Sequence, residues 1–420
     1  MGNRRVRSAA FGLAAATAAG MVAASAAGCG SGASERPKHL TVSVDRPSGP
    51  AYDPVSVKVA GGDPGSTVTL TATADDEHGV RWTSKAAFRA DARGAVDLTR
   101  QVPIGGSYGG VDPMGLFWSM DPPSGISAQS FATEGFTATI TAADQGATAT
   151  AAVTREFKTA GETIQALTVA HDGFEGHLFL PSGIGEPRPA LMMIGGSEGG
   201  ESPYTAAMLM ASQGHPVLSV GYFGVPGTPP ALKEIPLEYF VKAVTWLQQQ
   251  PQVAKQRTVV YGVSRGSEAA LLLAQNFPDL VHGAVLIAPS AEIWDAYPGP
   301  GAAWTLHGAR IAPAGTDIPV DKVAGPVLAF AGTDDKLWTS ASWARQIDEE
   351  LNRAHDPYPH SEHEYADAGH MVGSIPYLPS LTTYVLNGKA LQLGGTRQAN
   401  SAAQTQTWKA VSDLLAGRSG

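Results

Sequence analysis

Ser264 occupies a setting in which a serine hydroxyl becomes a nucleophile. An apolar run at 259–261 breaks at Gly262-Val263-Ser264-Arg265-Gly266 and is followed by a helix-forming run at 269–274. A strand that turns sharply into a helix around Gly-x-Ser-x-Gly is the arrangement of a nucleophile elbow. The glycines leave room for a strained serine backbone, and the N–H groups that open the helix face a developing negative charge. Ser264 is therefore the candidate nucleophile.

A candidate acid and a candidate base follow Ser264 in chain order. An apolar run at 327–330 leads into Gly332-Thr333-Asp334-Asp335, so the carboxylates lie at the carboxyl end of a predicted strand. Asp335 is the candidate acid and Asp334 the competing one, although one or both could instead cap a helix that begins near Ser340. His370 follows the strand-like run 364–366 through a glycine turn and is the candidate general base, which the acid would hold in one tautomer. The remaining histidines considered are interpreted as surface or packing residues: His215, His282 and His363.

An oxyanion hole needs two backbone N–H donors. One is expected from Arg265, the residue after the nucleophile, and the other from Gly196 or Ser197 in the glycine-rich turn at 195–200. This turn lacks the Gly-Lys-Ser/Thr ending of a phosphate loop and any dinucleotide fingerprint, so no cofactor is predicted. The histidines lack paired ligand spacing, so no metal is predicted either. Glu268 is interpreted as a first-turn carboxylate that complements the helix dipole.

The elements that must position these residues alternate between strands and helices. Near-continuous apolar runs are typical of parallel strands buried on both faces, and residues 237–247 keep helical spacing between two of them. The order of strands and helices predicts a doubly wound α/β sheet, the α/β-hydrolase fold. The runs that predict its strands are 178–180, 190–194, 217–220, 259–261, 284–287 and 327–330.

The residues before this region alternate with a period of two instead. Runs at 40–44, 55–59 and 68–72, with further strands expected within 81–89 and 137–150, are separated by turn-forming clusters. This pattern predicts an antiparallel immunoglobulin-like β-sandwich. The predicted organisation is a signal peptide at 1–28, a tether at 29–38, an all-β immunoglobulin-like domain at 39–158 and an α/β-hydrolase domain at 159–418.

The first 28 residues have the charged and apolar regions of an export signal. They end in Ala26-Ala27-Gly28-Cys29, which resembles a bacterial lipobox, so Cys29 is expected to be lipidated and to anchor the chain to the outer face of the cytoplasmic membrane. A plain secretory signal or a single hydrophobic anchor are the alternatives. Cys29 is the only cysteine, which excludes an intramolecular disulfide. A net charge of −9 argues against a nucleic-acid partner, and the oligomeric state is not indicated.

Several motifs together are similar to those of one family. The chain resembles the acyl-CoA thioesterase / bile acid-CoA:amino acid N-acyltransferase family, whose members join an immunoglobulin-like domain to an α/β-hydrolase domain. The resemblance implies that a serine nucleophile accompanies thioester hydrolysis, whereas members that conjugate amino acids use cysteine. Two features depart from the family: Arg265 after the nucleophile, and the export signal. The resemblance rests on 105–118, 237–240, the Ser264 elbow, 332–338, 368–370, 394–397 and 408–409.

The expected activity is that of a serine acyl-thioester hydrolase acting on a small molecule through a covalent acyl-enzyme. The alternative is an exported carboxylic-ester hydrolase or acyltransferase of the cell envelope, and a third reading is a binding lipoprotein without catalysis. The Pro- and Gly-rich segment 291–323 is expected to form a lid or pocket wall. Within it, Arg310 and Lys322 are candidates for binding an anionic substrate, with solvated surface charge as the alternative.

Overall fold

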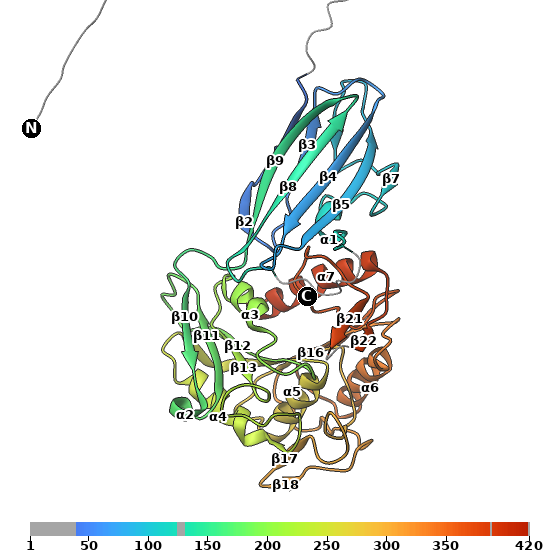
Figure 1. Cartoon of the computed structure of the whole chain (residues 1–420). Coiled ribbons are helices and arrows are strands. Elements are labelled where there is room, and N and C mark those ends of the chain that lie inside the picture. The colour runs from blue at the N-terminus through green and yellow to red at the C-terminus, as the bar shows by residue number, and fades with distance from the viewer. Residues whose placement is uncertain (1–38, 124–130, 387–388, 419–420) are drawn as a thin grey trace, which may run out of the picture. The chain divides into compact units, whose positions relative to one another are not determined.

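The computed structural model describes residues 39–123, 131–386 and 389–418 (Figure 1). The described residues belong to one compact unit that begins at His39. The predicted signal peptide, the tether and the candidate lipidation residue Cys29 lie outside the described residues.

An N-terminal domain rich in β-sheet begins the described chain. Its strands alternate as the sequence predicts: in β5, Trp82, Ser84, Ala86 and Phe88 are buried between exposed or half-buried neighbours. The strand expected within 81–89 is β5, and the region 137–150 lies within a hairpin of two strands. One sheet has the order β2 (Ser48–Pro50), β9 (Ala147–Glu156), β8 (Gly135–Asp144), β4 (Thr67–Asp75), β5 (Arg81–Arg89) and β7 (Gly105–Gly106); the other has β1 (Thr41–Val44), β3 (Val57–Ala60) and β6 (Val96–Asp97).

The second domain is built on an eight-stranded sheet. Its first two strands are antiparallel to their neighbours, and the remaining six run parallel. The third and fourth strands along the chain exchange places in the sheet. This topology is that of an α/β-hydrolase, as predicted. The spatial order is β10 (Thr163–Leu167), β11 (Glu175–Leu180), β13 (Val217–Gly221), β12 (Arg188–Ile194), β15 (Val253–Val263), β16 (Ala284–Ile287), β19 (Val327–Gly332) and β20 (His360–Tyr365).

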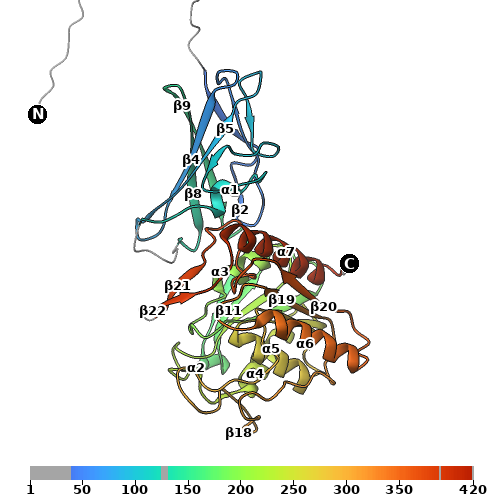
Figure 2. The same ribbon diagram turned by 90° about the vertical axis from the view of Figure 1, so that its right-hand side faces the viewer.

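Helices cover both faces of this sheet (Figure 2). Alternate residues of one strand point to opposite cores: Leu191 and Met193 belong to one apolar cluster, while Ala190, Met192 and Ile194 belong to the other. The first cluster includes residues of α3 (Tyr204–Ala211) and α7 (Arg397–Leu415). The second includes residues of α4 (Leu237–Gln248), α5 (Arg265–Asn276) and α6 (Ser340–Arg353). Because both faces of the sheet are buried, the sequences of its parallel strands are almost continuously apolar.

Short elements complete the fold around the sheet. They are α1 (Gly115–Trp118), α2 (Val169–Asp172), β14 (Ile235–Pro236), β17 (Trp304–Leu306), β18 (Ala309–Arg310), and the hairpin of β21 (Thr383–Leu386) and β22 (Lys389–Gln392). None of the helices in the described ranges is both long and apolar enough to cross a membrane.

Arg397 joins the two domains at the start of α7. Its guanidinium donates hydrogen bonds to the backbone oxygens of Trp118 at 3.1 Å and Met120 at 2.6 Å, and it forms an ion pair with Asp121. Two of the stretches that carry the family resemblance, 105–118 and 394–397, therefore meet in space.

Candidate active site

Ser264 sits at the tight turn between β15 and α5. Its backbone has φ 54° and ψ −120°, a strained conformation for a residue with a side chain. Its N–H donates to the carbonyl of Ile287 at 2.8 Å, which holds the turn against the neighbouring strand. A β-carbon on Gly266 would overlap with the carbonyl oxygens of Ile194 and Gly195, so this position accepts no side chain. The Gly-x-Ser-x-Gly spacing therefore follows from close backbone packing.

Asp335 and His370 lie together at the carboxyl edge of the sheet. His370 Nδ1 is 2.8 Å from Asp335 Oδ2, and the two side chains are only 5% and 2% exposed. Asp335 also accepts hydrogen bonds from the N–H of Leu337 at 2.9 Å and the hydroxyl of Ser340 at 2.6 Å. Asp334 turns away from the histidine, pairs with Lys336 and accepts the N–H of Gly395. Of the two candidate acids, Asp335 is the one that contacts His370.

The loop that carries His370 is fixed from several sides. The His370 N–H donates to the carbonyl of Leu393 at 2.8 Å, and Asn400 of α7 accepts the N–H of Gly369 at 2.7 Å. The indole of Trp338 lies edge-on to the imidazole, with 5.8 Å between ring centroids. The imidazole is therefore held in place by packing as well as by Asp335.

The turn after β12 brings its backbone beside Ser264. Tyr222, buried at the end of the neighbouring strand, donates its hydroxyl to the carbonyl oxygens of Gly195 and Gly196, both at 3.0 Å. The N–H of Gly196 points to the side chain of Glu198, whose Oε1 accepts it at 3.0 Å. Ser197 and Glu198 line the same cavity as Ser264. A backbone donor of this turn thus already binds an anionic oxygen near the nucleophile.

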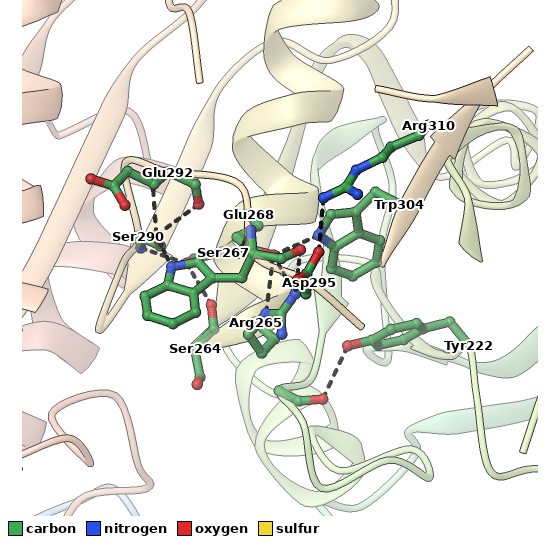
Figure 3. A network of polar contacts seen from close by, with 12 residues as sticks. Tyr222, Ser264, Arg265, Ser267, Glu268, Ser290, Glu292, Asp295, Trp304 and Arg310 are labelled. Carbon is green, nitrogen blue, oxygen red and sulfur yellow. Dashed lines mark hydrogen bonds and ion pairs between the residues drawn. The ribbon is translucent and has the colours of Figure 1, made fainter. Parts of the chain in front are cut away.

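Arg265 is buried behind the nucleophile, not beside the acyl site. Its guanidinium pairs with Glu268 Oε2 at 3.0 Å, and Glu268 also accepts the indole N–H of Trp304 at 2.5 Å and the backbone N–H of Trp294 at 3.0 Å (Figure 3). Burial raises the pKa of Glu268 to about 7. The interpretation of Glu268 as a residue that merely complements the helix dipole is therefore wrong, because it is the centre of a buried network.

A cavity of about 380 Å³ contains Ser264 and His370. Most of its walls are apolar, and they come from the ends of the sheet strands, the start of α3 and the region 371–393. These apolar residues include Met193, Val263, Ile287, Met371, Ile375, Leu378, Leu381, Leu391 and Leu393. Such a cavity suits an uncharged acyl chain whose carbonyl reaches the serine.

The segment 291–323 does not wall this cavity, contrary to the sequence-based expectation. None of the cavity-lining residues in the described ranges comes from it. The segment packs behind the elbow instead, through the Glu268 network, and Arg310 forms an ion pair with Asp295 at 2.8 Å. Arg310 and Lys322 are both exposed. Neither residue lines the cavity, so neither meets a substrate there.

His215 and His363 have packing roles. Buried His215 contacts the carbonyl of Pro189, and His363 stacks on Phe330 with 4.7 Å between ring centroids. Sequence reasoning missed Tyr222, Glu198 and Asn400 as parts of the site. Tyr222 directly follows the strand β13, and a residue at the carboxyl end of a parallel strand could have been recognised as a candidate for the site from the sequence. No sequence pattern marks Glu198 or Asn400 in this way.

Comparison with known proteins identifies the family. A profile described as "Acyl-CoA thioester hydrolase/BAAT N-terminal region" matches residues 52–169. A second, "BAAT / Acyl-CoA thioester hydrolase C terminal", matches residues 235–296 and 311–416, and so omits the β17–β18 region. Both domains are thus matched by profiles of one family.

Individual proteins of the same family are similar to this chain over most of their length. Acyl-coenzyme A amino acid N-acyltransferase 2 of Rattus norvegicus is 30% identical over 404 residues, covering 86% of this chain and 94% of that protein. Acyl-coenzyme A thioesterase 6 of Mus musculus is 29% identical over 401 residues, covering 88% and 95%. The peroxisomal succinyl-coenzyme A thioesterase of Mus musculus is 28% identical over 404 residues, covering 88% and 95%. The two thioesterases support the expectation of a hydrolase, and the chain belongs to the acyl-CoA thioester hydrolase/BAAT family.

Proposed function

We propose that the protein is a serine acyl-thioester hydrolase with Ser264 as nucleophile, His370 as general base and Asp335 as the acid that orients it. The observation that carries this proposal is the 2.8 Å contact between His370 and Asp335 at the cavity that Ser264 also lines. The site combines a serine at a strained turn, a buried carboxylate–imidazole pair and an apolar cavity. That combination suits acyl transfer.

In the first half of the reaction, Ser264 Oγ attacks the acyl carbon while His370 Nε2 takes its proton. The negative oxygen that forms is stabilised by the backbone N–H of Arg265 and by an N–H of Gly196 or Ser197. The C–S bond then breaks, the sulfur takes the proton from His370, and an ester to Ser264 remains. Asp335 keeps the Nδ1 proton in place throughout and stabilises the imidazolium.

In the second half, water replaces the thiol. His370 takes a proton from the water as its oxygen attacks the acyl carbon, and returns it to Ser264 Oγ as the ester bond breaks, releasing the free acid. Serine rather than cysteine at position 264 favours water over an amino acid as the acceptor, since the family's conjugating members use cysteine. The sole cysteine, Cys29, is far away in sequence.

One observation favours the alternative of an exported carboxylic-ester hydrolase or acyltransferase. Among the described residues that line the cavity there is no lysine or arginine, whereas coenzyme A carries several phosphate charges. We therefore retain an ester substrate of the cell envelope as the second candidate function.

We further propose that the chain is exported and anchored through lipid on Cys29. Support comes from the apolar signal and the lipobox-like residues before this cysteine. Metabolic labelling with an alkyne fatty acid should mark the wild type in the membrane fraction and leave Cys29→Ser unmarked. An unmarked wild type would contradict the anchor.

The β-sheets of the N-terminal domain support the finer proposal of an immunoglobulin-like sandwich at 39–158, followed by the catalytic domain at 159–418. The strands alternate between buried and exposed residues, and two sheets share the core. Limited proteolysis should cut first near 158–163; resistance there with cleavage inside either domain would contradict these boundaries.

Matched substrates decide between the two candidate activities. The full chain, purified in detergent, would be given a coenzyme A thioester and a p-nitrophenyl ester of the same fatty acid. The thioester proposal expects kcat/KM for the coenzyme A thioester to equal or exceed that for the ester. Turnover of the ester alone would establish the second candidate, and turnover of neither would favour a binding protein.

A further inference from the structure

Glu198 places a carboxylate at the reacting end of the cavity. It lies in the turn after β12, is exposed, and lines the cavity together with Ser264 and His370. Its Oε1 accepts the N–H of Gly196 at 3.0 Å, the same N–H that is a candidate donor to the acyl oxygen. The carboxylate therefore lies beside the position expected for the acyl carbonyl oxygen.

The position of Gly196 shows how close the carboxylate is to the nucleophile. A β-carbon built on Gly196 would lie 2.7 Å from Glu198 Oε2 and 3.1 Å from Ser264 Cβ. Both atoms thus surround one point, and they are within about 6 Å of each other. A negative charge on an acyl group attached at Ser264 would therefore lie close to the Glu198 carboxylate, and two like charges at short range repel each other where water is partly excluded.

No cation neutralises this carboxylate within the part of the chain that the structure describes. The cavity lining there contains no lysine or arginine, and the nearby guanidinium of Arg265 is committed to Glu268. The same turn holds a second carboxylate, Glu201, but this one pairs with His177 at 2.7 Å and does not line the cavity. The two carboxylates of one turn therefore have different surroundings.

We propose that Glu198 determines which acyl groups the site accepts. Its carboxylate rejects acyl groups that carry a negative charge near the reacting carbonyl, and it favours those that carry a hydroxyl, amide N–H or ammonium group there. When the acyl oxygen takes the N–H of Gly196, Glu198 loses that hydrogen bond, and a donor on the acyl group replaces it. An acyl carboxylate offers no donor and adds repulsion. This inference rests on the proposed acyl hydrolase function.

The role proposed for Glu198 predicts a substrate preference that differs from the one named for a relative. The peroxisomal relative of Mus musculus is named for succinyl-coenzyme A, whose acyl group ends in a carboxylate. With Glu198 in place, we expect this chain to discriminate against such a substrate.

The test compares three thioesters of N-acetylcysteamine, whose leaving group is uncharged: butyryl, 3-hydroxybutyryl and succinyl. The full chain in detergent would be assayed for kcat/KM as wild type, Glu198→Gln and Glu198→Ala, with spontaneous hydrolysis subtracted. Wild type should turn over the succinyl thioester on the order of tenfold more slowly than the butyryl thioester. In both variants this ratio should fall to about threefold or less, and the preference for the 3-hydroxybutyryl thioester should disappear.

Glu201→Gln is the matched control, because it removes a carboxylate from the same turn but outside the cavity. It should leave the substrate ratios as in wild type. The inference is overturned if Glu198→Gln leaves the succinyl-to-butyryl ratio unchanged, if it changes all three substrates by one factor, or if Glu201→Gln shifts the ratio as much. Failure of the proposed function looks different: no thioester is turned over by wild type, and no fluorophosphonate adduct forms.

Discussion

Replacing Asp335 with asparagine should disable His370 without disturbing the fold. Asp335 Oδ1 accepts two backbone hydrogen bonds, from Leu337 at 2.9 Å and Trp338 at 3.4 Å, while Oδ2 faces His370 Nδ1. An asparagine keeps its carbonyl oxygen toward the backbone donors, because flipping the amide would lose both bonds at about 1–3 kcal/mol each. Its NH₂ group then points at Nδ1.

The consequence is a change of tautomer. An NH₂ group at this position donates to Nδ1, so the imidazole proton moves to Nε2, which no longer accepts the proton of Ser264. The comparable loss of a correctly placed acid lowers kcat by about 10⁴-fold. This corresponds to about 5.4 kcal/mol of transition-state stabilisation.

The assay is steady-state hydrolysis of a p-nitrophenyl ester by Asp335→Asn and Asp334→Asn, with the thermal melting temperature as a check on folding. Asp334→Asn is the matched control, since Asp334 pairs with Lys336 and not with the histidine; its kcat should stay within about threefold of wild type. A folded Asp335→Asn that keeps kcat within tenfold of wild type would contradict this role of Asp335, and so would an equal loss of kcat in Asp334→Asn.

Three further predictions concern stability. Gly266→Ala should lower the free energy of unfolding by about 3 kcal/mol or more in urea denaturation, because a β-carbon overlaps with carbonyl oxygens of the neighbouring loop; an unchanged midpoint would contradict this. The pKa of Glu268 is about 7 in the folded state and about 4.5 in the unfolded state. Between these two pH values the folded state binds one more proton, so the free energy of unfolding should fall by on the order of 3 kcal/mol as the pH rises from about 4.5 to about 7, and stay level above pH 7. Glu268→Gln should flatten this slope, and an identical slope in both proteins would argue against it. Arg397→Ala should lower the free energy of unfolding by about 3 kcal/mol, because it leaves the carbonyls of Met120 and Ser380 without their donor. Arg397→Lys should recover less than half of this loss, and full recovery by lysine would refute the role of the guanidinium geometry.

The sequence was most informative where local pattern and chain order coincide. The elbow at Ser264 is visible because a strand, a Gly-x-Ser-x-Gly turn and a helix follow one another without interruption. The carboxyl ends of parallel strands lie at one edge of a sheet, so the turns after the predicted strands at 327–330 and 364–366 are expected on the same edge. That is why Asp335 and His370 could be named before the structure placed them 2.8 Å apart.

Side-chain direction and loop path were not predictable in the same way. Arg265 follows the nucleophile in sequence, yet its guanidinium turns into the protein because buried Glu268 offers it a partner. The segment 291–323 was expected at the pocket because of its length and composition, but its tryptophans find hydrogen-bond acceptors behind the elbow. The cavity wall comes instead from α3 and the region 371–393. These outcomes depend on contacts between residues distant in the chain, which no local pattern encodes.

The central claim is that Ser264 forms a covalent acyl-enzyme at this site. The most direct test treats the full chain, in detergent, with a fluorophosphonate probe and locates the adduct by mass spectrometry of the digested protein. We expect one adduct, on Ser264, in wild type, a much slower reaction in Asp335→Asn, and no adduct in Ser264→Ala. An unlabelled wild type, or a label on another residue that persists in Ser264→Ala, would contradict it.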